Sequence, residues 1–297
     1  MKILNFGSLN YDYVYSVNHI VEPGETIFST GLDVFCGGKG LNQSVALARA
    51  GSNVYHAGMV GSDGEMLCNT CKENNINSDY IKFVTERTGN AIIQVSENGQ
   101  NSIVLFGGAN RKNTEEYINN VLSNFQAGDM LLMQNEINLV DYLIEKAFEK
   151  QMIIALNPSP FDEKMLKCNF NKVSYFLMNE VEGKQITGKT KPEEILEVMR
   201  RKYPSSKVVL TLGKAGVIYS DNEKFCSHGI YKINVLDTTA AGDTFTGFFL
   251  SSVLQNKTIE EALRIASVAS SIAVSKKGAT SSIPFLSDVL SANLEIK

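Results

Sequence analysis

Short apolar runs that recur along the chain constrain its fold more than any other feature of the sequence. Each run is nearly continuous in apolar residues and is bounded by turn residues; the runs span residues 3–6, 54–59, 130–133, 153–156, 175–178, 208–212 and 217–219. Most of the segments between them have a helical length and place apolar residues three or four positions apart. Strands that are apolar on both faces and alternate with helices are typical of a parallel sheet covered on both sides. The chain of 297 residues is therefore predicted to form an α/β fold, a doubly wound and mostly parallel sheet with helices on both faces.

Two regions depart from this alternation and predict a second, smaller sheet. Residues 11–17 and 27–35 are rich in β-branched and aromatic residues. Residues 91–95 and 102–106 flank Asn98-Gly99, which signals a hairpin because both residues tolerate positive φ. No helix is predicted between these strands, so they should form a mostly antiparallel sheet that stands off the main domain. We expect one α/β domain over residues 1–297, with a β-sheet lid formed by about residues 11–35 and 91–107.

Charge and composition argue against several classes of protein. The 28 basic and 32 acidic residues give a net charge of −4, and no block of Lys and Arg provides the electrostatic footprint of a nucleic-acid-binding protein. The apolar runs are far shorter than the ~18 residues of a membrane span, and the first residues lack the ~7-residue apolar segment of a secretory signal. The five scattered cysteines are typical of free thiols in a reducing compartment, and Cys68 and Cys71 fit a helix better than a zinc site. We expect a cytoplasmic protein that binds neither nucleic acid nor membrane.

Two turns rich in glycine and other small residues run into predicted helices. The first is Gly37-Gly38-Lys39-Gly40, and the second is Ala240-Ala241-Gly242. Such turns direct free backbone N–H groups outward, and the N-terminus of a helix favours an anion. Taken alone, each turn is explained equally well as a tight strand-to-helix connection. Neither has the spacing of a Walker A loop, and the first lacks the dinucleotide-binding fingerprint, which disfavours NAD as a ligand.

Asp243 follows the second turn directly. A carboxylate in the first turn of a helix is stabilised by the helix dipole, and its simplest role is to cap the helix. Here the preceding Ala240, Ala241 and Gly242 are too small to shield it. A carboxylate beside free amides can take the proton of a hydroxyl while the amides hold a phosphoryl group. This arrangement favours phosphorylation of a hydroxyl by ATP.

The two turns together resemble the motifs of the ribokinase family of carbohydrate kinases. The first motif fits in spacing at Gly37, Gly38, Gly40, Asn42, Ser44, Gly51 and Gly61, and the second fits from Asp237 through Asp243 to Gly247. The resemblance runs from residue 3 to about residue 285, with one departure at Phe248, where the family usually has Ala or Gly. It implies ATP-dependent phosphorylation of a sugar hydroxyl, with conversion of D-ribose to D-ribose 5-phosphate as the first expectation. The alternatives are another pentose, fructose or a nucleoside as acceptor, and a non-catalytic sugar-binding regulator.

The resemblance also implies roles for residues at the reaction centre. It makes Asp243 the catalytic base and the amides of Ala240, Ala241 and Gly242 the anion hole. The implied sugar-binding positions are Asn10, Asp12, Gly38, Lys39, Asn42, Glu136 and Asp243. The simpler readings are an Asx turn for Asn10 and Asp12, a solvated loop carboxylate for Glu136 and a surface position for Lys39.

Further positions are implied for the nucleotide and for metal ions. The ATP-binding positions are Asn179, Glu182, Thr211, Gly213, Gly216, Gly242 and Ser267. Asn179 and Glu182 are expected near the phosphates and Mg²⁺, with the carboxylate acting through water. Ser267 is explained almost as well by a role in helix packing as by a contact with the nucleotide. A monovalent cation, K⁺, is implied at Asp237, Thr239, Ala273, Lys276, Gly278 and Ser282, where Asp237 could instead cap a turn.

The lid is expected to close over the sugar and to pair with the lid of a second subunit, giving a homodimer. One of its faces is predicted to be too apolar to leave in water; the residues assigned to it are Val14, Val17, Ile27, Phe28, Ile92, Val95, Val104 and Phe106. Pairing would bury this face and protect the strand edges. A monomer whose lid folds back onto its own core is the alternative. Tyr11 would either narrow the sugar pocket or face the outer surface of the lid.

Overall fold

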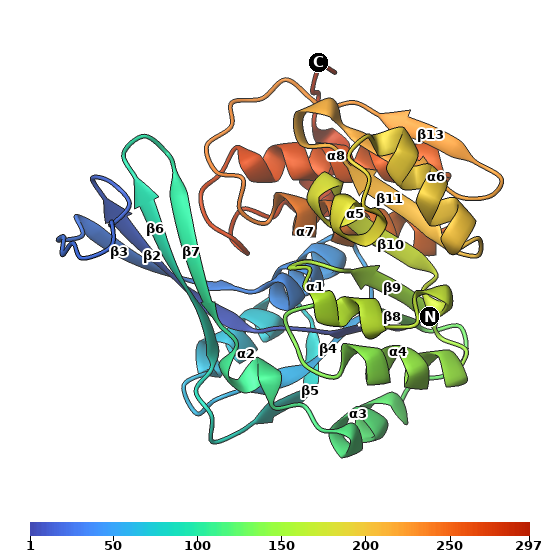
Figure 1. Cartoon of the computed structure of the whole chain (residues 1–297), viewed down its shortest axis with the longest axis horizontal. Coiled ribbons are helices and arrows are strands. Elements are labelled where there is room, and N and C mark those ends of the chain that lie inside the picture. Colours follow the sequence, from blue (N-terminus) through green and yellow to red (C-terminus); the bar gives the residue numbers. More distant parts are fainter.

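The predicted strands form a nine-stranded sheet. In the computed structural model, which describes residues 1–297, its order is β13-β12-β11-β10-β9-β8-β1-β4-β5 (Figure 1). The strands are β1 (Ile3–Phe6), β4 (Val54–Val60), β5 (Asn77–Phe83), β8 (Met130–Gln134), β9 (Ile153–Asn157), β10 (Tyr175–Asn179), β11 (Lys207–Thr211), β12 (Val217–Ser220) and β13 (Phe225–His228). Neighbours are parallel except at β11–β12 and β12–β13. The predicted fold class is confirmed, and the strand order reverses at β1, a point where such sheets commonly bind ligands.

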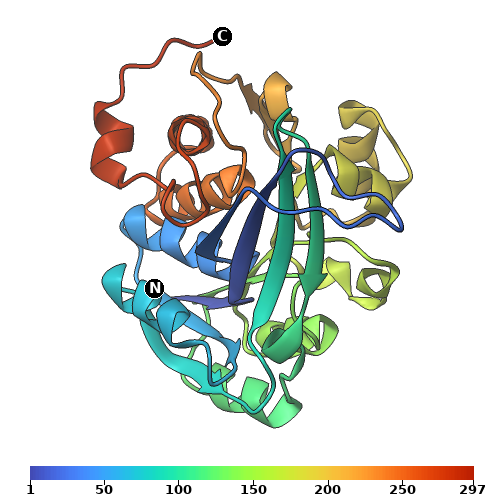
Figure 2. The same cartoon turned by 90° about the vertical axis from the view of Figure 1, so that its left-hand side faces the viewer.

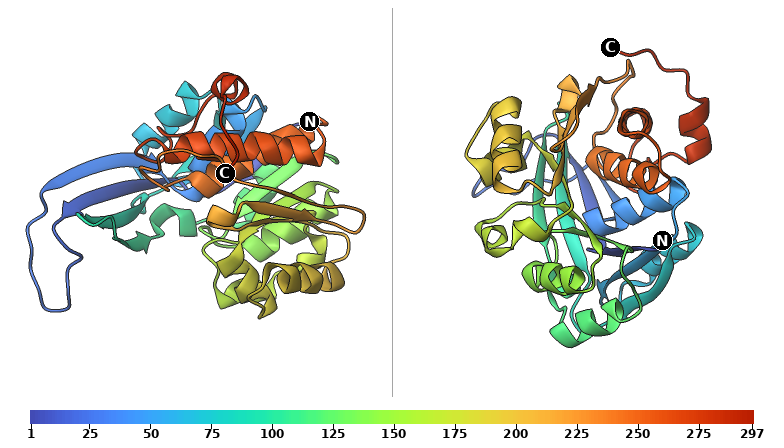
Figure 3. Two further views of the ribbon diagram at one scale, coloured as in Figure 1. Left: turned by 90° about the horizontal axis from the view of Figure 1, so that it is seen from above. Right: turned by 90° about the vertical axis from the view of Figure 1, so that its right-hand side faces the viewer.

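Helices cover both faces of this sheet (Figure 3). They are α1 (Lys39–Arg49), α2 (Glu65–Glu73), α3 (Glu115–Leu122), α4 (Val140–Glu149), α5 (Glu180–Thr187), α6 (Pro192–Lys202), α7 (Ala241–Leu254), α8 (Ile259–Val274) and α9 (Leu286–Ser291), with short 3₁₀ turns η1 (Gly108–Arg111), η2 (Glu163–Lys167), η3 (Phe170–Lys172) and η4 (Gly213–Ala215). Successive side chains of a strand enter different cores. Ile3 packs in a cluster with residues of α1, α7 and α8, whereas Leu4 packs in one with residues of α3, α4 and α6. None of the helices combines the length and the apolar composition that a membrane crossing requires.

Helices α1 and α7 run parallel and touch along their backbones. A Cβ on Gly247 of α7 would lie 2.7 Å from the backbone nitrogen of Leu47 and 2.4 Å from the Cβ of Ala46, so only glycine allows this approach. One turn further along, Ser251 Oγ of α7 donates a hydrogen bond to the carbonyl of Ala50 at 3.0 Å. In both contacts the residue of α7 lies about 200 positions after its partner in the sequence. The first turns of the two helices therefore lie side by side as well.

A second sheet stands off the main domain (Figures 1 and 2). Its order is β3-β2-β6-β7, formed by β3 (Gly31–Gly37), β2 (Asn10–Val17), β6 (Gly89–Ser96) and β7 (Asn101–Phe106). The β2–β3 and β6–β7 pairs are antiparallel and β2–β6 is parallel, which confirms a small, mostly antiparallel sheet. The strand expected from residue 27 begins only at Gly31, because residues 18–30 form a loop at the far end of the sheet (Figure 3).

The register of the small sheet corrects the predicted apolar face. Val14 and Val95 lie on the face that carries Asp12, whereas Val17, Ile92, Val104 and Phe106 lie on the opposite face. The prediction mixed two faces because it treated strands separately, without the pairing that decides which side chains align. Ile27 and Phe28 belong to the loop, where Phe28 is 97% exposed. The exposed apolar side chains opposite Asp12, here called the outer face, are Leu32, Val34, Ile92, Val104 and Phe106.

Candidate active site

Asp243 lies in the first turn of α7 and faces α1. Its Oδ2 accepts a hydrogen bond from Asn42 Nδ2 at 3.0 Å, and its Oδ1 accepts one from Gln43 Nε2 at 2.8 Å. The residue is only 6% exposed. No backbone N–H donates to the carboxylate, which excludes its simpler reading as a helix cap. A buried carboxylate held by two amides is oriented toward what enters between the helices.

The turn before Asp243 leaves several backbone amides free. Ala240 adopts a left-handed backbone, with φ at 58°, at the start of α7. The N–H groups of Ala240, Gly242 and Asp243 donate to no group of the chain, whereas that of Ala241 donates to the carbonyl of Thr238 at 3.3 Å. Free N–H groups at a helix N-terminus suit an anion. Of the three predicted amides, the structure leaves two free and adds that of Asp243 itself.

Asp12 is a buried carboxylate without a hydrogen-bond partner. It lies within β2, is 9% exposed and accepts no hydrogen bond from the chain. Gly37 makes room for it, because a Cβ there would lie 2.0 Å from Asp12 Oδ2. Burial, followed by the charges of Glu136 and Asp243, raises the pKa of Asp12 to about 7. A position inside a strand excludes the Asx turn, and an unpaired buried acceptor indicates a place for a ligand's donor group.

Glu136 and Lys39 lie on the same side of the site. Ser8 Oγ and the backbone N–H of Lys39 both donate to Glu136 Oε2, the latter at 3.0 Å. Burial raises the pKa of Glu136 against the opposing charge of Lys39. Burial disfavours the charged form of Lys39, but the charges of Asp243, Glu136 and Glu182 outweigh it and raise the pKa of Lys39. Glu136 is therefore not a solvated loop carboxylate, and Lys39 is a cation set among carboxylates.

The other predicted sugar-binding positions adjoin these groups. Asn10 Oδ1 accepts a hydrogen bond from Asn110 Nδ2 at 2.7 Å. Asn42 Oδ1 is buried and has no partner. Gly38 precedes α1 with φ at 89°, a conformation that favours glycine, and its Cα lies against the backbone of Asn10. The structure thus gathers all the predicted sugar-binding positions where β2, α1 and α7 meet. Tyr11 lies on the face opposite Asp12, as the second alternative predicted, but its ring is buried there and its hydroxyl donates to the carbonyl of Asp63 at 2.6 Å.

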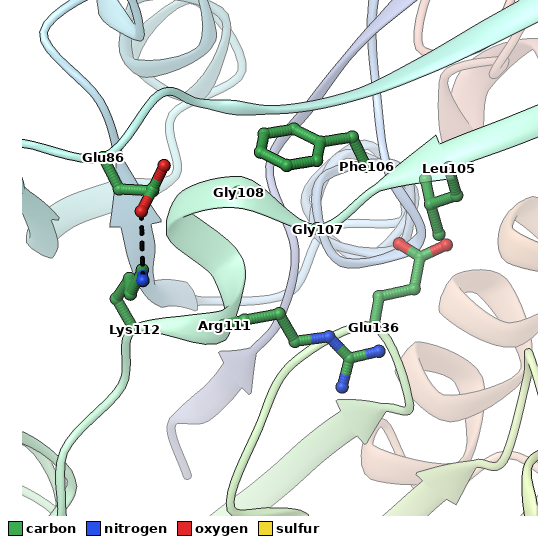
Figure 4. A pocket seen from close by; sticks show the side chains of 8 residues that line it. All are labelled: Glu86, Leu105, Phe106, Gly107, Gly108, Arg111, Lys112 and Glu136. Carbon is green, nitrogen blue, oxygen red and sulfur yellow. Dashed lines mark ion pairs between the residues drawn. The ribbon is translucent and has the colours of Figure 1, made fainter.

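A cavity of about 430 Å³ includes Glu136 and lies between β7 and η1 (Figure 4). Its lining residues are Glu86, Leu105, Phe106, Gly107, Gly108, Arg111, Lys112 and Glu136. Lys112 pairs with Glu86 at 3.0 Å, and Arg111 Nη1 donates to the carbonyl of Ile137 at 2.7 Å. Sequence reasoning missed Arg111, because nothing in the local pattern sets η1 against the loop that follows β8.

A smaller cavity, of about 70 Å³, joins Asp243 to several predicted nucleotide-binding residues. Its polar lining residues include Lys39, Asn157, Ser159, Asn179, Glu182 and Thr211, with Gly242 beside Asp243. Asn179 caps α5, and Glu182 accepts from its backbone N–H at 2.7 Å and from its Nδ2 at 3.0 Å. These positions lie at the carboxyl ends of β9, β10 and β11, where the sheet opens toward α7.

The remaining nucleotide positions lie outside that cavity. Gly213 and Gly216 have φ at 53° and 94° in the turn after β11, and space is open beside Gly213. Ser267 is a buried residue of α8 that lines neither cavity, so its reading as a helix-packing serine fits the structure as well as the predicted contact. The sequence could not distinguish the two roles of Ser267, because only the packing of α8 decides which of its residues reach the site.

Two segments predicted to hold a cation lie together. Asp237 Oδ1 accepts from the backbone N–H of Thr239 at 2.9 Å and from its hydroxyl at 2.6 Å, as a turn cap does. Its Oδ2 reaches across to the backbone N–H of Gly278 at 2.9 Å. The backbone N–H of Asp237 also donates to the carbonyl of Val274, next to Ala273. In the same loop the backbone N–H of Lys276 donates to Ala273, and the hydroxyl of Ser282 donates to Ala279. No group of three or more His, Cys, Asp or Glu side chains is arranged to hold a metal ion.

Comparison with known proteins identifies the family. The model of the pfkB family of carbohydrate kinases matches residues 1–286. The chain belongs to that family. This carbohydrate kinase is 36% identical to the ribokinase of Haemophilus influenzae over 296 residues, which cover 96% of this chain and 95% of the relative. The family predicted from the two glycine-rich turns is confirmed.

Solved structures agree with this carbohydrate kinase in fold. The ribokinase of Cryptococcus neoformans, in complex with ADP, is 31% identical, with a TM-score of 0.84 over 97% of this chain and 98% of that one. The ribokinase of Arabidopsis thaliana, complexed with ribose and ATP, is 28% identical, with a TM-score of 0.83 over 97% of both chains.

We expect Asp12→Asn to remove a pH dependence from the stability of the protein. The folded protein keeps the Asp12 proton up to about pH 7, whereas the group has a pKa of 3.8 when unperturbed. The free energy of unfolding should therefore fall as the pH rises through this window, by at most about 1.4 kcal/mol per pH unit. Urea denaturation of both proteins between about pH 4 and pH 7 measures the two slopes. Equal slopes would contradict the raised pKa.

Proposed function

We propose that this chain transfers the γ-phosphoryl group of ATP to the 5-hydroxyl of D-ribose. The observation that carries the proposal is Asp243, which lies between free backbone N–H groups and buried acceptors that lack partners. Free N–H groups suit a phosphoryl group, and unpaired acceptors suit the hydroxyls of a sugar. The similarity to ribokinases over nearly the whole chain supports ribose as the acceptor. The free state of all five cysteines supports a reducing, cytoplasmic setting.

In the proposed reaction, Asp12, Asn42 and Glu136 accept hydrogen bonds from the sugar hydroxyls. Asp243 takes the proton of the 5-hydroxyl as its oxygen forms a bond to the γ-phosphorus. The bond from that phosphorus to the bridging oxygen breaks, and ADP leaves with the electron pair. The free N–H groups of Ala240, Gly242 and Asp243 stabilise the charge on the transferred group, and the Lys39 ammonium balances it.

The nucleotide is proposed to occupy the smaller cavity and the turn after β11. Asn179, Glu182 and Thr211 line the cavity, while Gly213, Gly216 and Ser267 belong to the proposed set on family resemblance. Mg²⁺ prefers hard oxygen ligands and keeps several waters. Both oxygens of Glu182 already accept hydrogen bonds from Asn179, so the donor set fits an ion that is held mainly by phosphate oxygens and contacts Glu182 through water.

We expect Asp243→Asn to lower kcat for ribose phosphorylation by at least ~10²-fold, the usual contribution of a general base. The substitution keeps the shape of the side chain and removes its basicity. Ribose should still raise the melting temperature of the variant, because the other acceptors are intact. Assays of the wild type with ribose, another pentose, fructose and a nucleoside supply the reference. Near-normal turnover of the variant would reject the base, and a better kcat/KM for another acceptor would reject ribose.

We propose that K⁺ binds beside the anion-binding turn. Asp237 ties the segment before α7 to the loop that follows α8, through Gly278 and Val274. An ion among the carbonyls of Asp237, Thr239, Ala273, Lys276, Gly278 and Ser282 would hold both segments in one arrangement. It would act on the amides of the turn without contacting the sugar.

Replacing K⁺ by Na⁺ or Li⁺ at constant ionic strength is expected to lower kcat severalfold, because the smaller ions match a carbonyl ring poorly. The KM for ribose should change less, since the ion is remote from the sugar. Steady-state kinetics in the three chloride salts measures both quantities. Identical kcat values in all three would count against the site.

We also propose that the small sheet is a lid, and that its outer face pairs with that of a second copy. The face that carries Asp12 lies toward the sugar-binding positions. The opposite face exposes Leu32, Val34, Ile92, Val104 and Phe106. Contiguous apolar side chains of this kind are typical of interaction surfaces. A two-fold pairing would cover them and the edges of the sheet.

Light scattering at micromolar concentration is expected to give the mass of two chains. Replacing Ile92 and Val104 together by Lys places charges on the outer face and should give the mass of one chain. Phe28→Lys is a matched control, because Phe28 is 97% exposed on the loop and lies off the sheet. A monomer mass for the wild type would refute the pairing.

A further inference from the structure

A chain of buried polar side chains leads from Asp243 into the interior of the protein. Its members are completely buried side chains from β1, α1, β4 and β8, namely Asn5, Gln43, Ser44, His56 and Gln134. Each is 0% exposed. Burial of five polar side chains behind one carboxylate is costly unless their hydrogen bonds are made, so the pattern of those bonds carries information.

The hydrogen bonds run outward from Gln134 in two directions, toward Asp243 and toward His56. Gln43 Nε2 donates to Asp243 Oδ1 at 2.8 Å, and Gln134 Nε2 donates to Gln43 Oε1 at 2.7 Å. Gln134 Nε2 also donates to Asn5 Oδ1 at 3.0 Å. Asn5 Nδ2 donates to the carbonyl of Gly40 at 2.7 Å and to Ser44 Oγ at 2.8 Å. Ser44 Oγ lies 2.8 Å from His56 Nδ1, which ends the chain.

Two groups that can only accept hydrogen bonds fix the orientation of every amide in this chain. A carboxylate and a backbone carbonyl can only accept, so Gln43 must turn its NH₂ to Asp243 and Asn5 must turn its NH₂ to Gly40. Gln43 Oε1 and Asn5 Oδ1 then both face Gln134, which must supply two N–H groups. Gln134 can do so only in one orientation, with its Oε1 left without a partner. The backbone of Gly7 closes over that oxygen, where a Cβ would lie 2.4 Å away.

We propose that Gln43 is a positioning residue for the Asp243 carboxylate, and that Gln134 holds Gln43 in the orientation that donates to it. The proposal rests on the proposed role of Asp243 as the base. Gln43 contacts Asp243 and reaches neither cavity, so it acts through that carboxylate alone. With Asn42 on Oδ2 and Gln43 on Oδ1, the carboxylate is held in one orientation.

The charges that face Asp243 come from other elements. Lys39 lies on α1, Asp12 on β2 and Glu136 after β8, and each interacts electrostatically with Asp243. Glu182 on α5 lines the same cavity. His56 at the end of the chain carries no charge near neutral pH, because burial lowers its pKa to about 4. The buried chain thus supplies oriented hydrogen bonds to the base without adding a second charge.

Gln43→Met tests the proposal, since methionine has the length of glutamine and donates no hydrogen bond. We expect kcat for ribose to fall about tenfold, because the Asp243 carboxylate loses the donor that orients it. The KM for ribose should stay within about twofold. Gln134→Met should lower kcat as well, by less. Gln43→Asn, which keeps the amide and is one methylene too short, gives the same readout should Gln43→Met fail to fold.

Ser206→Ala is the matched control. It removes another buried hydrogen bond, in which Ser206 Oγ donates to the carbonyl of Val173 at 2.7 Å, outside both cavities. It should lower the melting temperature while leaving kcat and KM unchanged. An unchanged kcat in the folded Gln43 variants would overturn the proposal. A wild type that phosphorylates no sugar would instead refute the proposed function, so the two failures are distinguishable.

Discussion

The parallel contact of α1 and α7 is the interaction on which the candidate active site depends. Because Gly247 has no side chain, the two backbones meet at Ala46 and Leu47, and the first turn of α7 lies against Asn42 and Gln43. The base, the amides that flank it and the residues that hold it are therefore placed by one helix pair. Close packing allows little adjustment at such a contact, so the packing of the core determines the positions of the groups in the candidate active site.

The central strands could be predicted from the sequence because they are buried on both faces. β1 and β8 are nearly continuous in apolar residues, and a parallel sheet covered by helices explains that pattern. β5 and β13 could not be predicted in the same way, since they are edge strands with many half-exposed or polar residues. The start of β3 was misplaced for a related reason. Residues 27–29 have strand-like composition, but no neighbouring strand pairs with them, and Thr30 makes one backbone hydrogen bond, to Ser16 of β2.

Site residues could be predicted where a charged residue follows a glycine-containing turn. They could not be predicted where tertiary packing alone brings a side chain to the site. Gly38 has a positive φ that few other residues adopt, and Asp243 directly follows the turn of small residues Ala240-Ala241-Gly242. Gln43 escaped notice although it contacts the base, because a local pattern does not say which side of a helix faces which neighbour. The signal was present in Asn42-Gln43-Ser44, a polar run that stays buried at the start of α1. Arg111 depends on a contact between distant segments and left no such signal.

The unpaired carboxylate of Asp12 links the lifetime of the protein to its ligand. Burial raises the pKa of Asp12 because it makes the ionised carboxylate costly in the empty fold, and a bound polyol that donates to this group would offset part of that cost. The unfolded fraction, which proteases and aggregation act on, therefore shrinks whenever such a ligand is abundant. On the proposed function, the empty protein is therefore the form that is degraded faster, and a plentiful supply of the sugar would protect it.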